Sequence, residues 1–87
     1  RAAPVVVATA GRVVRARIAR GLPASTTVTS FVVIDGTRVP LARQTTGRSG
    51  ALTLPAIRIA TAATYAVGIQ LPDSTVRWVT MKVGAAD

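Results

Sequence analysis

The 87-residue sequence has no histidine, cysteine, glutamate or asparagine, and its only acidic side chains are Asp35, Asp73 and Asp87. General acid–base catalysis, metal binding and nucleophilic triads draw mainly on histidine, cysteine and paired carboxylates. Asp35 and Asp73 are expected in turns, where aspartate bonds to nearby backbone, and two isolated carboxylates do not make a calcium cage. The sequence therefore predicts a non-enzymatic protein with no catalytic residue, metal site or cofactor.

Two further absences bear on compartment and membrane. Without cysteine the chain has no disulfide, and cysteine usage gives no indication of its redox compartment. No apolar run approaches the roughly 18 residues of a membrane span. The opening segment Ala2-Ala3-Pro4 is compatible with cleavage after a signal peptide, so a processed chain is expected.

The charge is strongly one-sided. Ten arginines and one lysine against three aspartates give a formal net charge of +8 and a pI of about 12.0. Such a surface favours anionic partners, either a protein or a polysaccharide surface, and the attraction weakens with salt. Nucleic acid is disfavoured, because single-strand binding uses several aromatic platforms and the chain has only Phe31, Tyr65 and Trp78.

β-Branched residues dominate what is present. Thirteen valines, five isoleucines and twelve threonines pack better on a pleated sheet than on a helix. The length predicts one domain over residues 1–87, which buries only about 60–65% of its unfolded surface and would gain stability from assembly. We therefore expect an all-β single domain without helix.

Turn residues divide the chain into about seven short strands, the pattern of a sandwich or small barrel. The expected strands are 4–8, 12–20, 26–34, 37–42, 51–54 with a resumption at 57–59, 65–71 and 75–83. Asp35-Gly36 predicts a two-residue type I′ hairpin, and Pro40 predicts an edge strand after it. Residues 44–50 are expected to form a mobile loop.

The last expected strand contains a conflict of parity. Val76 and Trp78 alternate on one face, whereas Val79, Met81 and Val83 alternate on the other. Either a bulge shifts the phase within the strand, or both of its faces are covered.

Two runs carry a family resemblance: Thr46-Gly47-Arg48-Ser49-Gly50-Ala51-Leu52-Thr53-Leu54-Pro55, and Ala62-Ala63-Thr64-Tyr65-Ala66-Val67-Gly68-Ile69. Over about residues 46–83 the chain resembles bacterial and phage immunoglobulin-like modules of the Cna-B-like or fibronectin-III-like kind. Those modules show a glycine before a short strand and a tyrosine opening the next long strand.

The resemblance implies an immunoglobulin-like β-sandwich of about seven antiparallel strands, with Tyr65 either at a tyrosine corner or as an ordinary core residue. Cna-B-like modules can form isopeptide bonds, which are not expected here because the chain has no asparagine or glutamate and Lys82 is its only lysine. The modules serve as stalks, adhesin repeats, accessory domains of secreted enzymes and phage decorations, among which the fold alone does not choose.

Arginines gather early in the sequence, at Arg12, Arg15, Arg17 and Arg20. Alternation places Arg15 and Arg17 side by side on an exposed face. They form either a docking stripe for phosphate or carboxylate, or a solvated face whose charges protect a sheet edge.

Two other segments are candidate contact sites. If Trp78 faces outward with Thr80 and Lys82, beside Arg77, it can stack on a sugar ring or anchor a protein interface; otherwise it is a core residue. The apolar segment Val5-Val6-Val7 can complete the sheet of a neighbouring subunit by strand addition, or it is an ordinary first strand.

Together these features predict a structural or adhesive module on an extracellular, cell-surface or virion surface. It presents Arg15, Arg17, Arg77 and Trp78 to an acidic or carbohydrate-bearing partner, with the 44–50 loop as a second contact zone. One alternative is an assembly subunit, such as a phage capsid or tail decoration protein or a filament protomer, which would be homo-oligomeric. Another is a carbohydrate-binding accessory domain of a secreted hydrolase.

Overall fold

The computed structural model describes residues 4–18 and 21–86. Some residues named in the predictions lie outside these ranges: residues 1–3 at the start of the chain, Arg20 of the arginine cluster, and Asp87.

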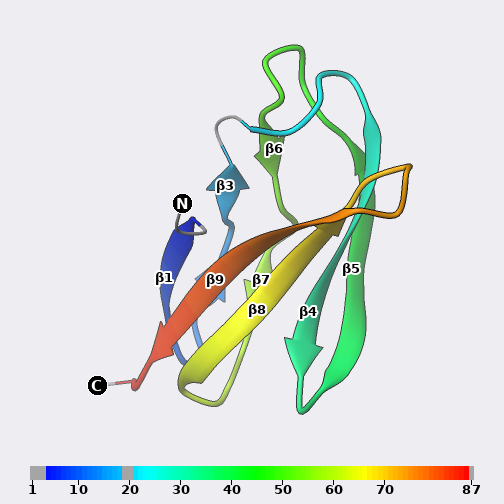
Figure 1. Cartoon of the computed structure of the whole chain (residues 1–87). Coiled ribbons are helices and arrows are strands. Elements are labelled where there is room, and N and C mark those ends of the chain that lie inside the picture. The colour runs from blue at the N-terminus through cyan, green and yellow to red at the C-terminus, as the bar shows by residue number, and fades with distance from the viewer. Residues whose placement is uncertain (1–3, 19–20, 87) are drawn as a thin grey trace.

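The described residues form nine strands and no helix. They therefore contain no helix long and apolar enough to cross a membrane. The strands are β1 (Val5–Thr9), β2 (Val13–Val14), β3 (Arg17–Ile18), β4 (Thr27–Ile34), β5 (Thr37–Thr45), β6 (Leu52–Thr53), β7 (Ile57–Arg58), β8 (Ala63–Gln70) and β9 (Val76–Gly84). One sheet has the order β1-β9-β8-β4-β5, and the pairs β2–β7 and β3–β6 lie behind it (Figure 1). The expected all-β class is confirmed.

The layer behind the five-stranded sheet is interrupted twice. The expected continuous strand over 12–20 is wrong, because β2 and β3 are separated by Arg15 and Ala16. β6 and β7 are separated by a stretch containing Pro55, which has no N–H to donate to a ladder. The Leu54 N–H still donates to the Ala16 carbonyl at 2.8 Å and bridges the two interruptions. The expected alternation holds, since Ala16 and Ile18 are buried.

Strand pairing is antiparallel except at one edge, where β1 runs parallel to β9. The expectation of antiparallel strands throughout is therefore wrong for β1. After Thr9 the chain turns, with the Arg12 N–H bonded to the Thr9 carbonyl at 3.0 Å, and enters β2 in the other layer. A strand that crosses between layers is not bound to the antiparallel direction that a tight hairpin imposes.

The β4–β5 hairpin has the predicted two-residue loop. Ile34 pairs with Thr37, and both loop residues have positive φ, 51° at Asp35 and 76° at Gly36. Such angles are those of a type I′ turn. β5 is an edge strand as expected, and the bulge opposite Ser30 and Phe31 lies beside Pro40.

The expected loop over 44–50 is wrong at its start. Gln44 and Thr45 belong to β5, and Thr46 is buried. The Thr46 hydroxyl donates to the Pro23 carbonyl at 2.5 Å and accepts the Thr26 N–H at 2.9 Å. These two bonds fix the chain where polar composition alone predicts a loop.

The core lies between the two layers. Its buried apolar residues include Val28, Val32, Val67, Ile69, Val79 and Met81 from the large sheet and Ala16, Ile18, Leu52 and Leu54 from the small pairs. Tyr65 packs against this core while its hydroxyl donates to the Thr61 carbonyl at 2.8 Å. The tyrosine corner, a core ring whose hydroxyl bonds to upstream backbone, is therefore confirmed.

Candidate binding face on the five-stranded sheet

β9 shows how the parity conflict resolves. It pairs with β8 without a register shift, so Val79, Met81 and Val83 point into the core. Trp78 is of the opposite parity and is 43% exposed. Neither a bulge nor a second covering layer is needed, and the alternative of Trp78 as a core residue is wrong.

A cross-strand row passes through the centre of the outer face. Pro40, Phe31, Gly68 and Trp78 lie opposite one another on β5, β4, β8 and β9. Gly68 has no side chain, so the Phe31 ring lies over the backbone of β8, where a Cβ atom would overlap the ring. Aromatic residues often cover a cross-strand glycine in this way. Phe31 is consequently only 5% exposed although it faces away from the core.

The Phe31 ring supports two neighbours. Trp78 meets it edge to face, with centroids 5.6 Å apart and an interplanar angle of 87°. The guanidinium carbon of Arg38 lies 4.5 Å from the Phe31 centroid and 5.9 Å from the Trp78 centroid. Both arrangements are favourable, since ring edges and cations are attracted to the negative face of an aromatic ring.

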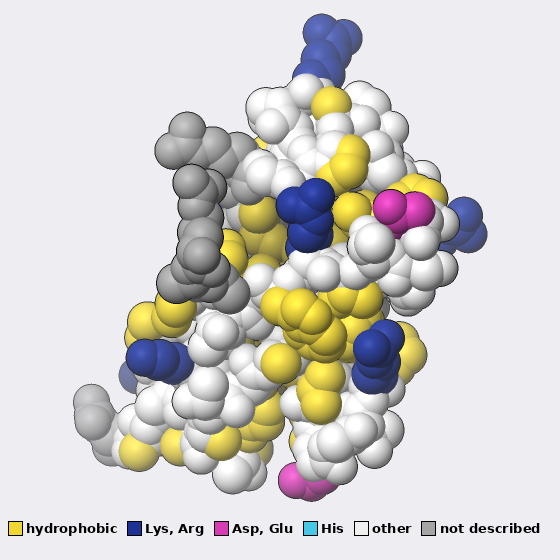
Figure 2. Space-filling model, in the orientation of Figure 1, with side chains coloured by type: hydrophobic (Ala, Val, Ile, Leu, Met, Phe, Trp, Pro, Cys, Tyr) yellow, Lys and Arg dark blue, Asp and Glu magenta, His cyan; other side chains and the backbone are white. Residues whose placement is uncertain are grey.

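We call the outer surface of β1, β9, β8, β4 and β5 the aromatic face, with Phe31, Arg38 and Trp78 at its centre. Val5 and Val7 on β1 extend it, because they pair with Thr80 and Lys82 of β9 and are 54% and 77% exposed. Figure 2 shows hydrophobic side chains gathered at the middle of this face, with Lys and Arg side chains beside and around them. The face combines apolar area with positive charge.

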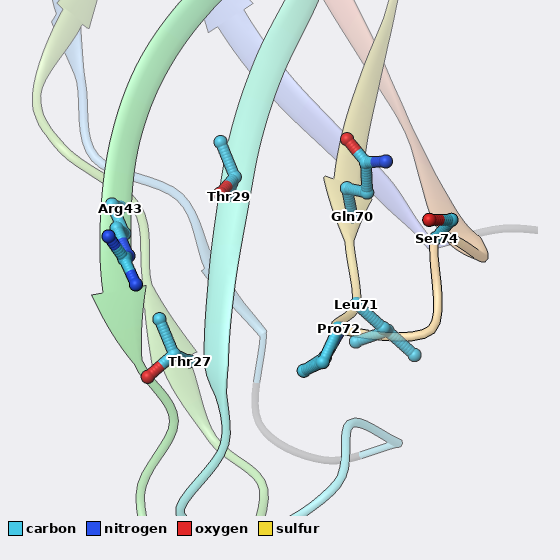
Figure 3. A pocket seen from close by; sticks show the side chains of 7 residues that line it. All are labelled: Thr27, Thr29, Arg43, Gln70, Leu71, Pro72 and Ser74. Carbon is cyan, nitrogen blue, oxygen red and sulfur yellow. The ribbon is translucent and has the colours of Figure 1, made fainter.

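An open pocket of about 350 Å³ lies at one end of the aromatic face. We call it the Arg43 pocket, and its lining residues are Thr27, Thr29, Arg43, Gln70, Leu71, Pro72 and Ser74 (Figure 3). They come from β5, β4, β8 and the turn between β8 and β9. Side chains with hydroxyl, amide and guanidinium groups thus line one opening above three neighbouring strands.

The carboxylate of that turn is already engaged. Asp73 Oδ1 accepts the Thr75 hydroxyl at 2.6 Å and the Thr75 N–H at 3.0 Å, and these bonds lower the pKa of Asp73. Among the described residues, no three His, Cys, Asp or Glu side chains are grouped as metal ligands would be.

The predicted Arg15 and Arg17 lie on the other layer. Both are exposed, as expected, and Arg58 on β7 is exposed on the same outer surface, since its partner Val13 has the parity of Arg15 and Arg17. We call Arg15, Arg17 and Arg58 the basic face. Sequence reasoning missed Arg58, because its neighbourhood depends on the β2–β7 pairing.

Arg77 belongs to neither face. It pairs with the inward-facing Ile69 near the start of β9, and its Nη1 donates to the Gly21 carbonyl at 3.0 Å. The structure therefore does not bring the four predicted residues together: Trp78 is on the aromatic face, Arg15 and Arg17 are on the basic face, and Arg77 ties β9 to the segment before β4.

The Val5-Val6-Val7 segment is a strand of the chain's own sheet, paired with β9 from Val5 to Thr9. Val6 packs against the core, whereas Val5 and Val7 face outward.

Sequence reasoning also missed Phe31 and Arg38. Two signals were present: the alternation over 27–34 gives Phe31 the parity of Thr29 and Val33, and Gly68 interrupts a strand of larger residues. A glycine within a strand often marks close approach of another group.

Comparison with known proteins agrees with this architecture. No family model and no curated protein matches the sequence. Solved structures do match: a chain of the ZIG-8–RIG-5 IG1–IG1 heterodimer has a TM-score of 0.54 at 20% identity, covering 94% of this chain and 82% of that one. The fold is immunoglobulin-like. A second immunoglobulin-like match is the natural killer cell receptor NKp44, with a TM-score of 0.54 at 15% identity over 99% of this chain and 100% of that one.

The immunoglobulin-like fold confirms the expected sandwich. The matched structures are a chain of a heterodimer and a receptor, and they do not indicate the Cna-B-like or fibronectin-III-like kind.

Proposed function

We propose that this immunoglobulin-like chain is a non-catalytic recognition module that binds an acidic protein partner through its aromatic face. The observation that carries the proposal is Trp78, 43% exposed and held in place by Phe31 and Arg38. Aromatic residues and arginine are enriched among the residues that dominate protein interfaces. A side chain that is already ordered also loses little entropy on binding.

Charge favours an acidic partner over a second copy of this chain. The five strands of the aromatic face contain no acidic residue, and their outward-facing basic residues are Arg38, Arg43 and Lys82. Two such faces in contact would bring like charges together, whereas an acidic surface would be complementary.

The neighbours in fold support recognition as the general role. One is a domain of a heterodimer and the other a receptor described as a triggering partner. We infer that residues 1–87 act as one domain. The domain would be displayed on an extracellular or particle surface, where it can bind an acidic protein partner.

The test is a binding screen with tetramers of the chain against surface and secreted proteins of its source, at low and at moderate salt. We expect partners that bind wild type and Arg17→Gln but not Trp78→Ala. Partners lost in Arg17→Gln and kept in Trp78→Ala, or no partner that depends on Trp78, would refute the aromatic face as the binding site.

The basic face supports a second candidate, docking to a polyanionic surface. Arg58 joins Arg15 and Arg17 there, so three guanidinium groups are exposed on one side of the sandwich. Heparin is a suitable probe. If the basic face docks polyanions, Arg17→Gln/Arg58→Gln elutes from heparin at lower salt than Arg38→Gln/Arg43→Gln, which loses the same charge; equal elution would indicate attraction by net charge alone.

The alternative function is that of an assembly subunit, in which the Val5–Val7 segment adds a strand to the sheet of a neighbouring subunit. Strand exchange would require β1 to leave its ladder with β9, and we therefore expect a monomer in light scattering at low and moderate salt. A stable oligomer that disappears on deletion of residues 1–10 would favour the subunit. Salt-insensitive retention on insoluble polysaccharide, lost in Trp78→Ala, would favour a carbohydrate-binding accessory domain.

A further inference from the structure

The Arg43 pocket is continuous with the centre of the aromatic face. Thr29 and Gln70 pair across β4 and β8, two residues along their strands from Phe31 and Gly68. Two residues of strand span about 7 Å, so one bound segment can contact both places. The pocket is therefore part of the same binding surface and must be explained together with it.

Most of the side chains that line the pocket carry a hydrogen-bond donor. Thr27, Thr29 and Ser74 contribute hydroxyls, Gln70 contributes an amide, and Arg43 contributes a guanidinium (Figure 3). Leu71 and Pro72 form an apolar wall, and no lining residue is acidic. Asp73, in the adjacent turn, is occupied by Thr75. A group that accepts several hydrogen bonds and carries negative charge would fit these donors.

Arg43 differs from the other arginines near this face. Arg38 lies against two rings, and Arg77 donates to the Gly21 carbonyl. Within the part of the chain that the structure describes, the Arg43 guanidinium has no such partner, although it lines the pocket. Its donors remain for a ligand.

We propose that the Arg43 pocket receives the carboxylate of a glutamate or aspartate side chain of the partner. This inference rests on the proposed function and adds the specific contact. The planar guanidinium fork matches the two oxygens of a carboxylate, and its single charge balances a monoanion. The hydroxyls and the amide donate to the remaining lone pairs, the wall of Leu71 and Pro72 contacts the methylene groups, and the aromatic centre takes an apolar residue of the same segment.

The pocket can be tested without knowledge of the partner. The probe is a tetraglutamate peptide, acetylated and amidated at its ends, titrated into ¹⁵N-labelled protein, with tetraglutamine as the uncharged peptide. We expect shifts at the amides of Thr29, Gln70 and Ser74 with tetraglutamate only. Arg43→Gln should weaken binding at least about tenfold, and Arg43→Lys should weaken it less, because lysine keeps the charge and loses the fork.

Arg58→Gln is the matched control, since it removes the same charge from the opposite layer. Equal weakening in Arg43→Gln and Arg58→Gln would overturn the inference, because it would show attraction by net charge. Tighter binding of inorganic phosphate or of a hyaluronan tetrasaccharide than of tetraglutamate would also overturn it, in favour of another oxyanion or an acidic sugar.

The two proposals can fail separately. A partner from the screen whose binding is lost in Trp78→Ala but unchanged in Arg43→Gln would refute the pocket inference and leave the proposed function intact. A partner insensitive to both substitutions would refute the proposed function.

Discussion

The aromatic face and the basic face use arginine in different ways. On the aromatic face Arg38 lies 4.5 Å from the centroid of Phe31 and is fixed beside Trp78. On the basic face Arg15, Arg17 and Arg58 are exposed. Charge on the first surface is combined with ordered apolar area, whereas charge on the second is solvated. The number of arginines on a surface is therefore a weaker sign of a binding site than the aromatic side chains that pack against them.

Strand length explains the difference. β4, β5, β8 and β9 contain eight or nine residues each and align side chains in rows across the sheet. Each strand of the basic face has two residues, and Arg15 lies in the interruption between two of them. Long ladders repeat cross-strand contacts, and such contacts order side chains.

The largest expected effect comes from filling the place of Gly68. Gly68→Ala puts a methyl group into the Phe31 ring and should lower the free energy of unfolding by about 1–3 kcal/mol, measured by urea denaturation. Gly84→Ala is the control, since its Cβ would meet only the Ala8 carbonyl, at 3.8 Å. Equal stability of the two variants would mean that Phe31 is not seated on Gly68.

Next in size is the coupling between Phe31 and Trp78. Their edge-to-face contact at 5.6 Å should give a coupling free energy of about 0.5–1.5 kcal/mol in a double-mutant cycle of Phe31→Leu and Trp78→Ala. Additive effects of the two substitutions would show that the rings do not order one another.

A smaller difference separates the arginines of the two faces. Arg38→Gln should cost roughly 0.5–1 kcal/mol, because it removes a cation from the ring face of Phe31. Arg17→Gln should change stability by less than about 0.5 kcal/mol, since its side chain is exposed. Thermal unfolding in the same buffer measures both, and equal losses would remove the contrast between the two faces.

The smallest effect concerns the turn beside the Arg43 pocket. The Thr75 hydroxyl and N–H lower the pKa of Asp73, so Thr75→Val should raise it toward its ordinary value, as followed by NMR titration. Because the folded-state pKa is the lower one, the turn's contribution to stability is present above the unfolded-state pKa and is lost as pH falls through the folded-state value. An unchanged pKa in Thr75→Val would mean that the hydroxyl does not hold the carboxylate.

Local chemistry predicted the parts of the fold that depend on few residues. Asp35-Gly36 specified its hairpin because both positions need positive φ, and alternation specified the inward face of β8. For β9 alternation left two readings open, and the structure decided between them. The end of β5 was not predictable in this way. From its sequence Thr46 is a loop residue, and only its bonds to Pro23 and Thr26, which lie 23 and 20 positions earlier, fix it.

The candidate site shows the same limit. Trp78 was predicted as a contact residue on the condition that it faces outward with Thr80 and Lys82, with a core position as the alternative. Its supports Phe31 and Arg38 were not, because their contacts depend on the order β9-β8-β4-β5 and on the register of each pair. Likewise, Arg77 looked equivalent to the other arginines until its carbonyl partner Gly21 was placed 56 positions away.

The sequence by itself determined the all-β class, the hairpin, the inward face of β8 and a positive surface, because these follow from side-chain branching, turn conformation, alternation and charge. Tertiary structure decided which positive charges share a face with the aromatic residues, which strand runs parallel and which polar side chains line a pocket together. These properties arise between strands that are distant in the chain, and register, not proximity in sequence, sets which of their side chains meet.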